Sequence, residues 1–198
     1  YEKDIHFVFE LIQNAEDNLY NTKITPELSF MLLNQDPTDT LGCEGCLCVI
    51  NNERGFIEEN IRGISGIGQS TKTKQQGFIG EKGIGFKSVF IVSPKPHIFS
   101  NGYHFYFTDE PGEVGLKYIV PNWVDQLPEI VTKNKSSTVL LLPIRKEKYK
   151  DIVENISDIT PEVLLFLSKL QGLSIEVGEH GQKKVMLRDQ NEDNSVVE

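Results

Sequence analysis

The sequence has no long hydrophobic run, few cysteines and no excess of positive charge, and each absence removes a class of protein. No apolar stretch approaches the ~20 residues of a membrane-spanning helix, so we expect no membrane insertion. Aspartate and glutamate (29) outnumber lysine and arginine (20), which gives a net charge of −9. Because broad binding to a phosphate backbone needs a basic face, we expect no direct nucleic-acid binding by this domain.

Only three cysteines are present, and all lie within residues 43–48. The spacing Cys43-x-x-Cys46 admits a zinc or redox interpretation, but a structural zinc site usually has four ligands and there is no second pair. The nearest histidines, His6 and His97, are far away along the chain. We favour the alternative of reduced cysteines, with Cys46 and Cys48 on a strand, and this interpretation predicts an intracellular protein.

Familiar phosphate-binding signatures are also absent. A Walker loop ends in Gly-Lys-Ser/Thr, whereas Lys82 is followed by Gly83. The dinucleotide fingerprint G-x-G-x-x-G is present only in reversed order, at Gly80, Gly83 and Gly85, and the HRD and DFG signatures of protein kinases are missing. What remains is a glycine turn that precedes a helical pattern over 86–92. Such a helix N-terminus suits phosphate, and the alternative is an ordinary turn packed on a core.

The 198 residues predict one domain over 1–188, followed by a polar tail over 189–198. The first residue is Tyr1 and helical periodicity begins at once, which indicates a fragment of a longer protein. Hydrophobic spacing predicts helices over 4–20, 58–64, 86–92, 146–157 and 161–170. It predicts strands over 27–33, 46–51, 97–100, 103–108, 117–120, 138–142, 173–177 and 183–188.

Two turn residues refine these strands. Asn101-Gly102 predicts a tight hairpin turn, and Pro143 is expected to close the strand over 138–142. The order of helices and strands is mixed and contains several hairpins. It therefore predicts an α+β fold, a two-layer sandwich in which helices cover one face of a mixed, mostly antiparallel sheet.

The first predicted helix has two different faces. Its apolar side is formed by Ile5, Val8, Ile12, Ala15 and Leu19. Glu10, Asn14 and Asp17 follow a spacing of i, i+4, i+7 and lie on the opposite side. They are either a solvated face or a ridge of oxygen-bearing side chains that positions a water molecule and a magnesium ion.

Residues 63–77 are glycine-rich and polar, with only two large apolar residues. Such a segment has little to bury, so we expect a mobile loop. Because a long loop in a compact domain is usually functional, and because this one adjoins the glycine turn, we interpret residues 63–79 as a lid. The alternative is a disordered connection.

The segment Glu10-Leu-Ile-Gln-Asn14-Ala-Glu-Asp17 resembles the N-box of the GHKL ATPases. This family includes the gyrase B subunit, the ninety-kilodalton heat-shock chaperone, histidine kinases, MutL and MORC proteins. Gly80-Glu-Lys-Gly83-Ile-Gly85-Phe-Lys-Ser88 resembles the second glycine box of the family. Three segments are similar to sequences of the plant NO VEIN family and of sacsin repeats: LIQNAEDN, GQSTK and GEKGIGFKSVF.

The resemblance implies a Bergerat fold that binds ATP or ADP with Mg²⁺. Glu10 would then be the general base that orients the attacking water. Asn14 would be the one direct protein ligand of Mg²⁺, and phosphate oxygens and waters would complete the octahedron. Asp17 would hold the neighbouring site or the ribose and base side, and Thr138 would support the adenine.

The same resemblance assigns the phosphates to the glycine box and the lid. Backbone N–H groups would hold them, from the segment that contains Gly80, Lys82, Gly83, Ile84, Gly85 and Phe86. The lid would contribute Ser70, Thr71 and Lys72, and Lys82, Lys87 or Lys72 would add positive charge.

One box departs from the family pattern. The first glycine box of the family is D-x-G-x-G, whose Asp accepts a hydrogen bond from the adenine amino group. Here the segment is Asn51-Asn52-Glu53-Arg54-Gly55-Phe56. Alignment on Gly55 puts Asn51 at the Asp position, and alignment on a shortened, sacsin-like box puts Glu53 there. We favour Glu53, although an asparagine also accepts through its carbonyl oxygen.

Two functions stay open at this point. The first is a slow Mg²⁺-dependent ATPase whose lid closes on ATP and drives a rearrangement in a larger regulatory protein. The second is a nucleotide-gated interaction module that binds ATP or ADP without significant hydrolysis. A histidine kinase ranks last. The resemblance suggests a nucleotide-dependent dimer or contacts with other domains of the same chain, and the nucleus as one candidate compartment.

Overall fold

The structure is a computed structural model that describes residues 5–65, 86–110, 120–135, 137–178, 181, 183–188 and 196–197. Several predictions fall outside these residues. They are the glycine box from Gly80 to Gly85, residues 66–79 of the expected lid, and residues 117–119 of one expected strand. Residues 63–65, the first three of the expected lid, instead end a helix, which corrects that boundary.

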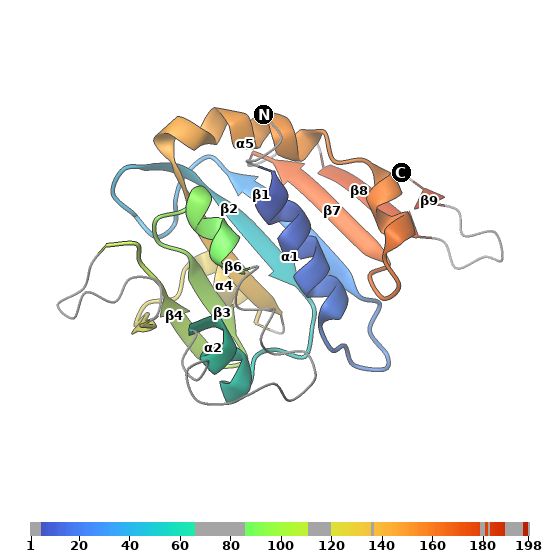
Figure 1. Cartoon of the computed structure of the whole chain (residues 1–198), viewed down its shortest axis with the longest axis horizontal. Helices are drawn as coiled ribbons and strands as arrows, with labels where there is room; N and C mark the ends of the chain where they lie inside the picture. Colours follow the sequence, from blue (N-terminus) through green and yellow to red (C-terminus); the bar gives the residue numbers. More distant parts are fainter. Residues whose placement is uncertain are drawn as a thin grey trace, which may run out of the picture.

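The fold is built on one mixed sheet, with the strand order β5-β4-β3-β6-β2-β1-β7-β8-β9 (Figure 1). The strands are β1 (Glu27–Leu33), β2 (Cys43–Asn51), β3 (His97–Ser100), β4 (Tyr103–Tyr106), β5 (Asn122–Trp123), β6 (Thr138–Arg145), β7 (Gly172–Val177), β8 (Lys183–Arg188) and β9 (Val196–Val197). Each neighbouring pair is antiparallel except β1 and β7, which are parallel. The prediction of an α+β fold with a mostly antiparallel sheet is therefore confirmed.

Helices lie on both faces of this sheet, which corrects the expectation of one covered face. Figure 1 shows α1 (His6–Asp17), α2 (Glu58–Ser65) and α5 (Lys146–Ser157) on the near side. The 3₁₀ segments η1 (Lys87–Ile91) and η2 (Pro161–Phe166) pack into the same core. The short helix α4 (Glu129–Lys133) packs on the opposite face and was missed, because five residues give little periodicity.

The two cores follow from the alternation of side chains along the central strands. In β2, Leu47 and Val49 join the core under α1, whereas Cys46 and Cys48 join the core under α4. Successive side chains of a strand point to opposite faces, so a central strand with both faces buried is almost continuously apolar. This explains why residues 46–50 read as one apolar run.

The first helix is shorter than its periodicity predicts. It ends at Asp17, and Asn18 has the extended backbone angles φ −66° and ψ 167°. Leu19, expected on the apolar side, therefore leaves the helix and is 65% exposed. The Lys169 ammonium donates to the carbonyls of Asp17 and Asn18, so it caps the end of α1.

Pro143 does not close its strand, because β6 continues to Arg145. The Arg145 N–H donates to Val92 O on the β3 side of β6. Residues two apart in a strand point their N–H groups the same way, so the N–H that Pro143 lacks would also face that side. The pairing of β3 with β6 stops at Leu141, and the proline therefore removes no ladder hydrogen bond.

Other boundaries also differ from the prediction. The helix expected over 161–170 is a 3₁₀ turn that ends at Phe166, and the one expected over 86–92 is mainly the 3₁₀ segment η1. A short strand lies at Asn122–Trp123 instead of at residue 120, and residues 196–197 of the expected tail pair with β8. Among the described residues, no helix combines the length and hydrophobicity that crossing a membrane requires.

Candidate functional site

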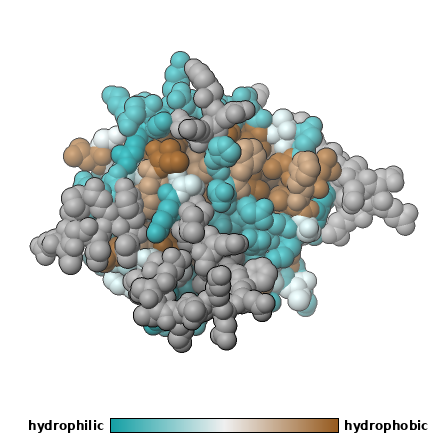
Figure 2. Space-filling model, viewed as in Figure 1, coloured by the Kyte–Doolittle hydropathy of each residue, from teal (hydrophilic) through white to brown (hydrophobic). Residues whose placement is uncertain are grey.

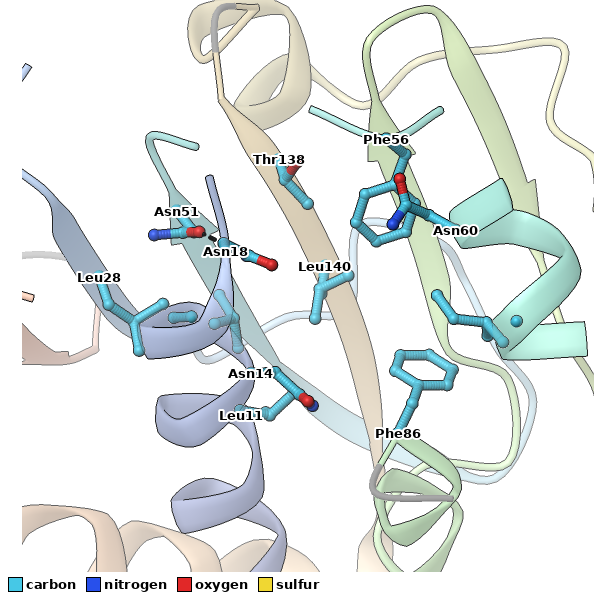
Figure 3. A pocket seen from close by; sticks show the side chains of 14 residues that line it. Leu11, Asn14, Asn18, Leu28, Asn51, Phe56, Asn60, Phe86, Thr138 and Leu140 are labelled. Carbon is cyan, nitrogen blue, oxygen red and sulfur yellow. Dashed lines mark hydrogen bonds between the residues drawn. The ribbon is translucent and has the colours of Figure 1, made fainter. Parts of the chain in front are cut away.

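A cavity of about 100 Å³ lies between α1, the sheet and α2 (Figure 3). Its apolar wall is formed by Leu11, Ala15, Leu28, Val49, Phe56, Ile64, Phe86 and Leu140. Its polar wall is formed by Asn14, Asn18, Asn51, Asn60 and Thr138, with Gly63 beside them. The cavity is lined mainly by apolar side chains, and a few neutral polar groups face into it.

Asn51 and Thr138 form the polar end of the cavity on the sheet. They face each other in register on β2 and β6, and both are 5% exposed. Because directly opposed residues on antiparallel strands project from the same face, both side chains reach the cavity wall. Two of the residues that the sequence analysis selected are thereby brought together from positions far apart in the chain.

The Asn51 amide is held by several partners. Its Nδ2 donates to Glu27 O at 2.8 Å and to the Tyr20 hydroxyl at 2.9 Å. Its Oδ1 accepts from Asn18 Nδ2 at 3.0 Å. The Tyr20 hydroxyl donates to Ala15 O at 2.7 Å, and burial raises the pKa of Tyr20 to about 12. Tyr20 therefore keeps its proton at neutral pH and links α1 to the end of β2.

Thr138 belongs to a chain of hydrogen bonds that ends on Glu53. Thr138 Oγ1 donates to Glu53 Oε1 at 2.6 Å and lies 2.5 Å from Ser100 Oγ. Ser100 Oγ in turn accepts the Phe56 N–H at 2.8 Å. A backbone N–H can only donate and an ionised carboxylate can only accept, so the hydroxyl protons run from Ser100 to Thr138 to Glu53. The network joins three segments around the cavity: the turn after β2, β3 and β6.

Phe56 reaches the cavity through the turn that follows β2. Gly55 has φ +91°, and a Cβ at this position would lie 2.7 Å from Asn101 Cβ. Only glycine fits such a conformation beside the hairpin turn. Asn101 Nδ2 then donates to Phe56 O at 3.0 Å. Asn101 and Gly102 have φ 48° and 84°, which confirms the predicted tight turn between β3 and β4.

The remaining wall comes from α1, α2 and the start of η1. Asn14 and Asn18 point toward the cavity from the last turn of α1 and its cap (Figure 3). Asn60 lies on α2 and its Oδ1 accepts the Ile57 N–H, which stabilises the helix N-terminus. Phe86 is 5% exposed and makes an edge-to-face contact with Phe107. The resemblance implied a phosphate contact for the Phe86 backbone N–H, and the structure places the Phe86 side chain in the cavity wall.

Three of the selected residues lie outside this wall. Glu10 and Asp17 are exposed on α1, and Asp17 accepts from Gln13 Nε2 at 3.4 Å. Glu53 is buried, but it contacts Thr138 and does not line the cavity. Between the two candidates for the first box, Asn51 is the one that the fold places at the cavity. Lys82, Gly83, Ile84, Gly85, Gly80, Ser70, Thr71 and Lys72 lie outside the described residues.

The sequence analysis missed Asn18, Tyr20, Phe56, Asn60 and Ser100. Asn18 had a signal that was available, because Glu10, Asn14 and Asn18 are spaced i, i+4, i+8 and so share one ridge of a helix. Tyr20 and Ser100 had none, because their roles depend on contacts between distant segments. In the part of the chain that the structure describes, no three His, Cys, Asp or Glu side chains converge on a metal position.

Comparison with known proteins places these features in a family. The Sacsin domain family model matches residues 1–123. Protein NO VEIN of Arabidopsis thaliana is 40% identical over 186 residues, which cover 86% of this chain and 6% of that protein. Sacsin of Homo sapiens is 34% identical over 97 residues, which cover 49% of this chain and 2% of that protein.

The chain therefore spans only a small part of the length of either relative. The matched residues 1–123 include α1, β2, α2, η1 and the β3–β4 hairpin, which carry most of the cavity wall. Since the family model covers more than half of the 198 residues, this chain belongs to the Sacsin domain family.

Proposed function

We propose that this domain binds ATP or ADP together with Mg²⁺, as a Bergerat-fold member of the GHKL ATPases. The adenine ring would enter the cavity, and the phosphates would extend toward Asn14 and the glycine box. In this proposal the bound nucleotide drives a conformational change in the larger protein to which the domain belongs, through closure of a lid at residues 66–79.

The observation that carries the proposal is the convergence of Asn14, Asn51 and Thr138 on one cavity. These residues were selected from two separate motifs and one late strand, and they meet although 124 positions separate the first from the last (138 − 14). The cavity also has a largely apolar lining with a few polar groups, as binding sites for small molecules usually do.

The residues present are compatible with Mg²⁺ in a supporting role. Mg²⁺ is usually bound by one or two protein oxygens together with substrate phosphates and waters. The Asn14 side chain supplies such an oxygen at the cavity edge, and Glu10 lies one turn earlier on the same helix. The ion would neutralise the phosphates, whereas Asn14 would position them relative to α1.

A calorimetric titration with ADP and a non-hydrolysable ATP analogue, with and without Mg²⁺, tests this proposal. We expect Mg²⁺-dependent binding, and we expect Asn14→Ala to weaken it by about tenfold or more, the loss of one charge-assisted contact. Gln13→Ala is the matched control, because Gln13 is exposed on the same helix and outside the cavity wall. Absence of binding at millimolar nucleotide, or equal loss in both variants, would contradict the proposal.

The second candidate, a module that binds nucleotide without hydrolysis, is favoured by one observation. Glu10, the expected general base, is exposed and does not line the cavity. If the domain is an ATPase, Glu10→Ala keeps nucleotide affinity and abolishes phosphate release, whereas Glu147→Ala on α5 changes neither. If phosphate release by the unmodified chain stays at background while ADP binds, the non-hydrolysing module is the correct description.

A further inference from the structure

A groove of about 550 Å³ lies between α1, the end of α5 and η2, and it shares no lining residue with the cavity. Its floor is formed by the buried side chains of Ile12, Ile159 and Leu167. Phe9 and Phe166 also line it, and they are 45% and 86% exposed. Because contiguous apolar side chains that stay exposed are typical of interaction surfaces, the groove is a candidate docking site.

The two sides of the groove are fixed to each other, so its shape is present before anything binds. Glu16 on α1 accepts hydrogen bonds from the backbone N–H groups of residues 168–170, which follow η2. Arg188 on β8 donates to the carbonyl oxygen of Leu167. The segment after η2 is therefore tied both to α1 and to the sheet, and Figure 1 shows α1 and α5 on the same side of this sheet. A groove with fixed walls loses little conformational entropy when it is occupied.

The walls of the groove favour a helical occupant. Its lining residues lie in α1, α5, η2 and the connection between α5 and η2, whereas β5 and β9 form the edges of the sheet. The N–H groups of Ile159, Val163 and Leu167 already donate to carbonyls three residues earlier. An extended peptide takes its backbone partners from a sheet edge, but a helix satisfies its own backbone groups. The wall from Ile5 to Gln13 is ~12 Å long, which accommodates about two helical turns.

The charges at the groove favour a basic occupant. Asp158 and Glu162 are exposed in its wall, and the described residues that line it include no lysine or arginine. Thr160 hydrogen-bonds with Glu162 and Lys184 attracts it, so Asp158 is the better carboxylate to test. A second copy of this chain would bring the same carboxylates and a net charge of −9, and an anionic lipid surface would repel them as well.

We propose that the groove between α1 and η2 binds a basic amphipathic helix of a partner protein. The apolar side of that helix would fill the groove between Phe9 and Phe166, and its lysine or arginine side chains would lie beside Asp158. Apolar burial supplies affinity in this mode of recognition, whereas the charges select and orient the partner. The proposal goes beyond nucleotide binding and does not depend on it.

Three fluorescein-labelled peptides of about 14 residues, roughly four helical turns, test the proposal by fluorescence anisotropy with the 198-residue chain. The first has leucine on one helical face and lysine on the other. The second has the same composition in scrambled order, and the third has glutamate in place of lysine. We expect the first to bind with a Kd of about 100 μM or lower, and the other two at least about tenfold more weakly. Raising NaCl from about 50 to 300 mM should weaken the first, because salt screens the charges.

Two variants and their matched controls place the binding in the groove. Phe166→Ser should weaken the lysine peptide by about fivefold or more, because an exposed aromatic anchor is lost. Leu41→Ser is its control, because Leu41 is 97% exposed in the loop before β2. Asp158→Asn should weaken the same peptide by about threefold and reduce the effect of salt. Asp125→Asn is its control, because Asp125 is exposed next to β5.

Several results would overturn the proposal. One is no binding of the lysine peptide at about 1 mM chain. Another is equal affinity for the scrambled peptide, or equal effects of the groove variants and their controls, which would indicate attraction to the acidic surface in general. Circular dichroism verifies that each variant is folded. If sedimentation equilibrium shows a dimer that Phe166→Ser dissociates and Leu41→Ser does not, the groove belongs to a second copy and the proposal is wrong.

Discussion

At the scale of single residues, His97 is a titratable group that the fold buries almost completely. It is 5% exposed and is stacked with Phe99 at a ring distance of 6.3 Å and tilted against Tyr106 at 5.1 Å. Its Nδ1 is buried without a hydrogen-bond partner among the described residues. Burial, aided by the nearby Lys95 charge, lowers the pKa of His97 from 6.5 to about 4. The imidazole is therefore neutral in the folded state.

This shift makes the free energy of unfolding depend on pH. The unfolded chain binds the proton near pH 6.5 and the folded chain only near pH 4, so stability is complete above pH 6.5 and falls between these values. One pKa unit corresponds to about 1.4 kcal/mol, so the loss from this group is on the order of 3 kcal/mol. Urea unfolding at a series of pH values should show this slope.

His97→Phe should remove that part of the slope, because the ring stacking is kept and the titration is lost. His6→Gln is the control, because His6 is exposed at the start of α1. A wild-type slope that survives in His97→Phe between pH 6.5 and 4 would show that other groups cause it.

For the first glycine box, the sequence alone left a choice between two residues that could contact the ring of a ligand. The sequence offered Asn51 and Glu53 as readers of the ring, and charge favoured Glu53. The fold places Asn51 directly opposite Thr138 in the cavity wall, whereas Glu53 lies past the end of β2 and accepts a hydrogen bond from Thr138. Such a choice depends on strand register, and register is not visible in a short segment read alone.

At the scale of elements, α1 is tied to the connection before β7 by one carboxylate. Glu16 is 8% exposed, and its oxygens accept from the backbone N–H groups of Ser168, Lys169 and Leu170 at 2.7 to 3.0 Å. These three N–H groups are no longer available for helical hydrogen bonds. This explains why the predicted helix over 161–170 ends at Phe166 and Leu167 is extended.

We expect Glu16→Gln to lower the free energy of unfolding by about 3 kcal/mol, because hydrogen bonds to a buried charge are lost and an NH₂ group meets backbone donors. Urea denaturation measures the effect, and hydrogen exchange should show faster exchange at residues 168–170. Glu154→Gln on α5 is the matched control, because Glu154 is exposed. Equal denaturation midpoints for the two variants would exclude this role of Glu16.

Most helices and strands could be predicted because they depend on residues that are neighbours in sequence. Most of their ends could not, because they depend on contacts between distant segments. The apolar runs at 27–33 and 46–51 and the Asn101-Gly102 turn depend on neighbours in sequence, and these predictions were confirmed. Three errors have non-local causes. The segment η2 ends early because Glu16 takes the N–H groups that a longer helix would use. The strand β6 continues through Pro143 because its pairing with β3 has already stopped, and Leu19 leaves α1 because Asn18 makes contacts outside the helix.

At the scale of the whole molecule, the sheet separates two hydrophobic cores. The three cysteines differ in how deeply they are buried beside one of these cores. Cys46 and Cys48 are 0% exposed in the core under α4, whereas Cys43 is half-buried. Burial raises the pKa of Cys48 to about 12 and that of Cys43 to about 11, and it raises the pKa of Cys46 well above its usual value. Because the thiolate is the reactive form, none of the three is activated.

We therefore expect iodoacetamide at pH 8 to label Cys43 first, and Cys46 and Cys48 only when the molecule unfolds. In increasing urea, the labelling rates of the two buried thiols should follow the fraction of unfolded protein, as mass spectrometry can resolve. Labelling of Cys46 in water as fast as Cys43 would show that the core under α4 opens independently of the sheet.

The surface adds a second whole-molecule feature. Figure 2 shows hydrophobic side chains gathered over η2, where Leu165 is 52% and Phe166 is 86% exposed. Hydrophobic spacing placed these two residues in a long helix with a buried side. In the shorter 3₁₀ segment both side chains are exposed instead.

The contact between Glu16 and Ser168 has a consequence for how this chain folds while it is being synthesised. The two residues are 152 positions apart, and synthesis at 5–20 residues per second takes roughly 8 to 30 seconds to cover that distance. For most of this interval α1 has been made while β6, which begins at Thr138, has not, and β7 follows only after Ser168. The apolar side of α1 therefore stays without its complete sheet in the nascent chain until the late strands emerge.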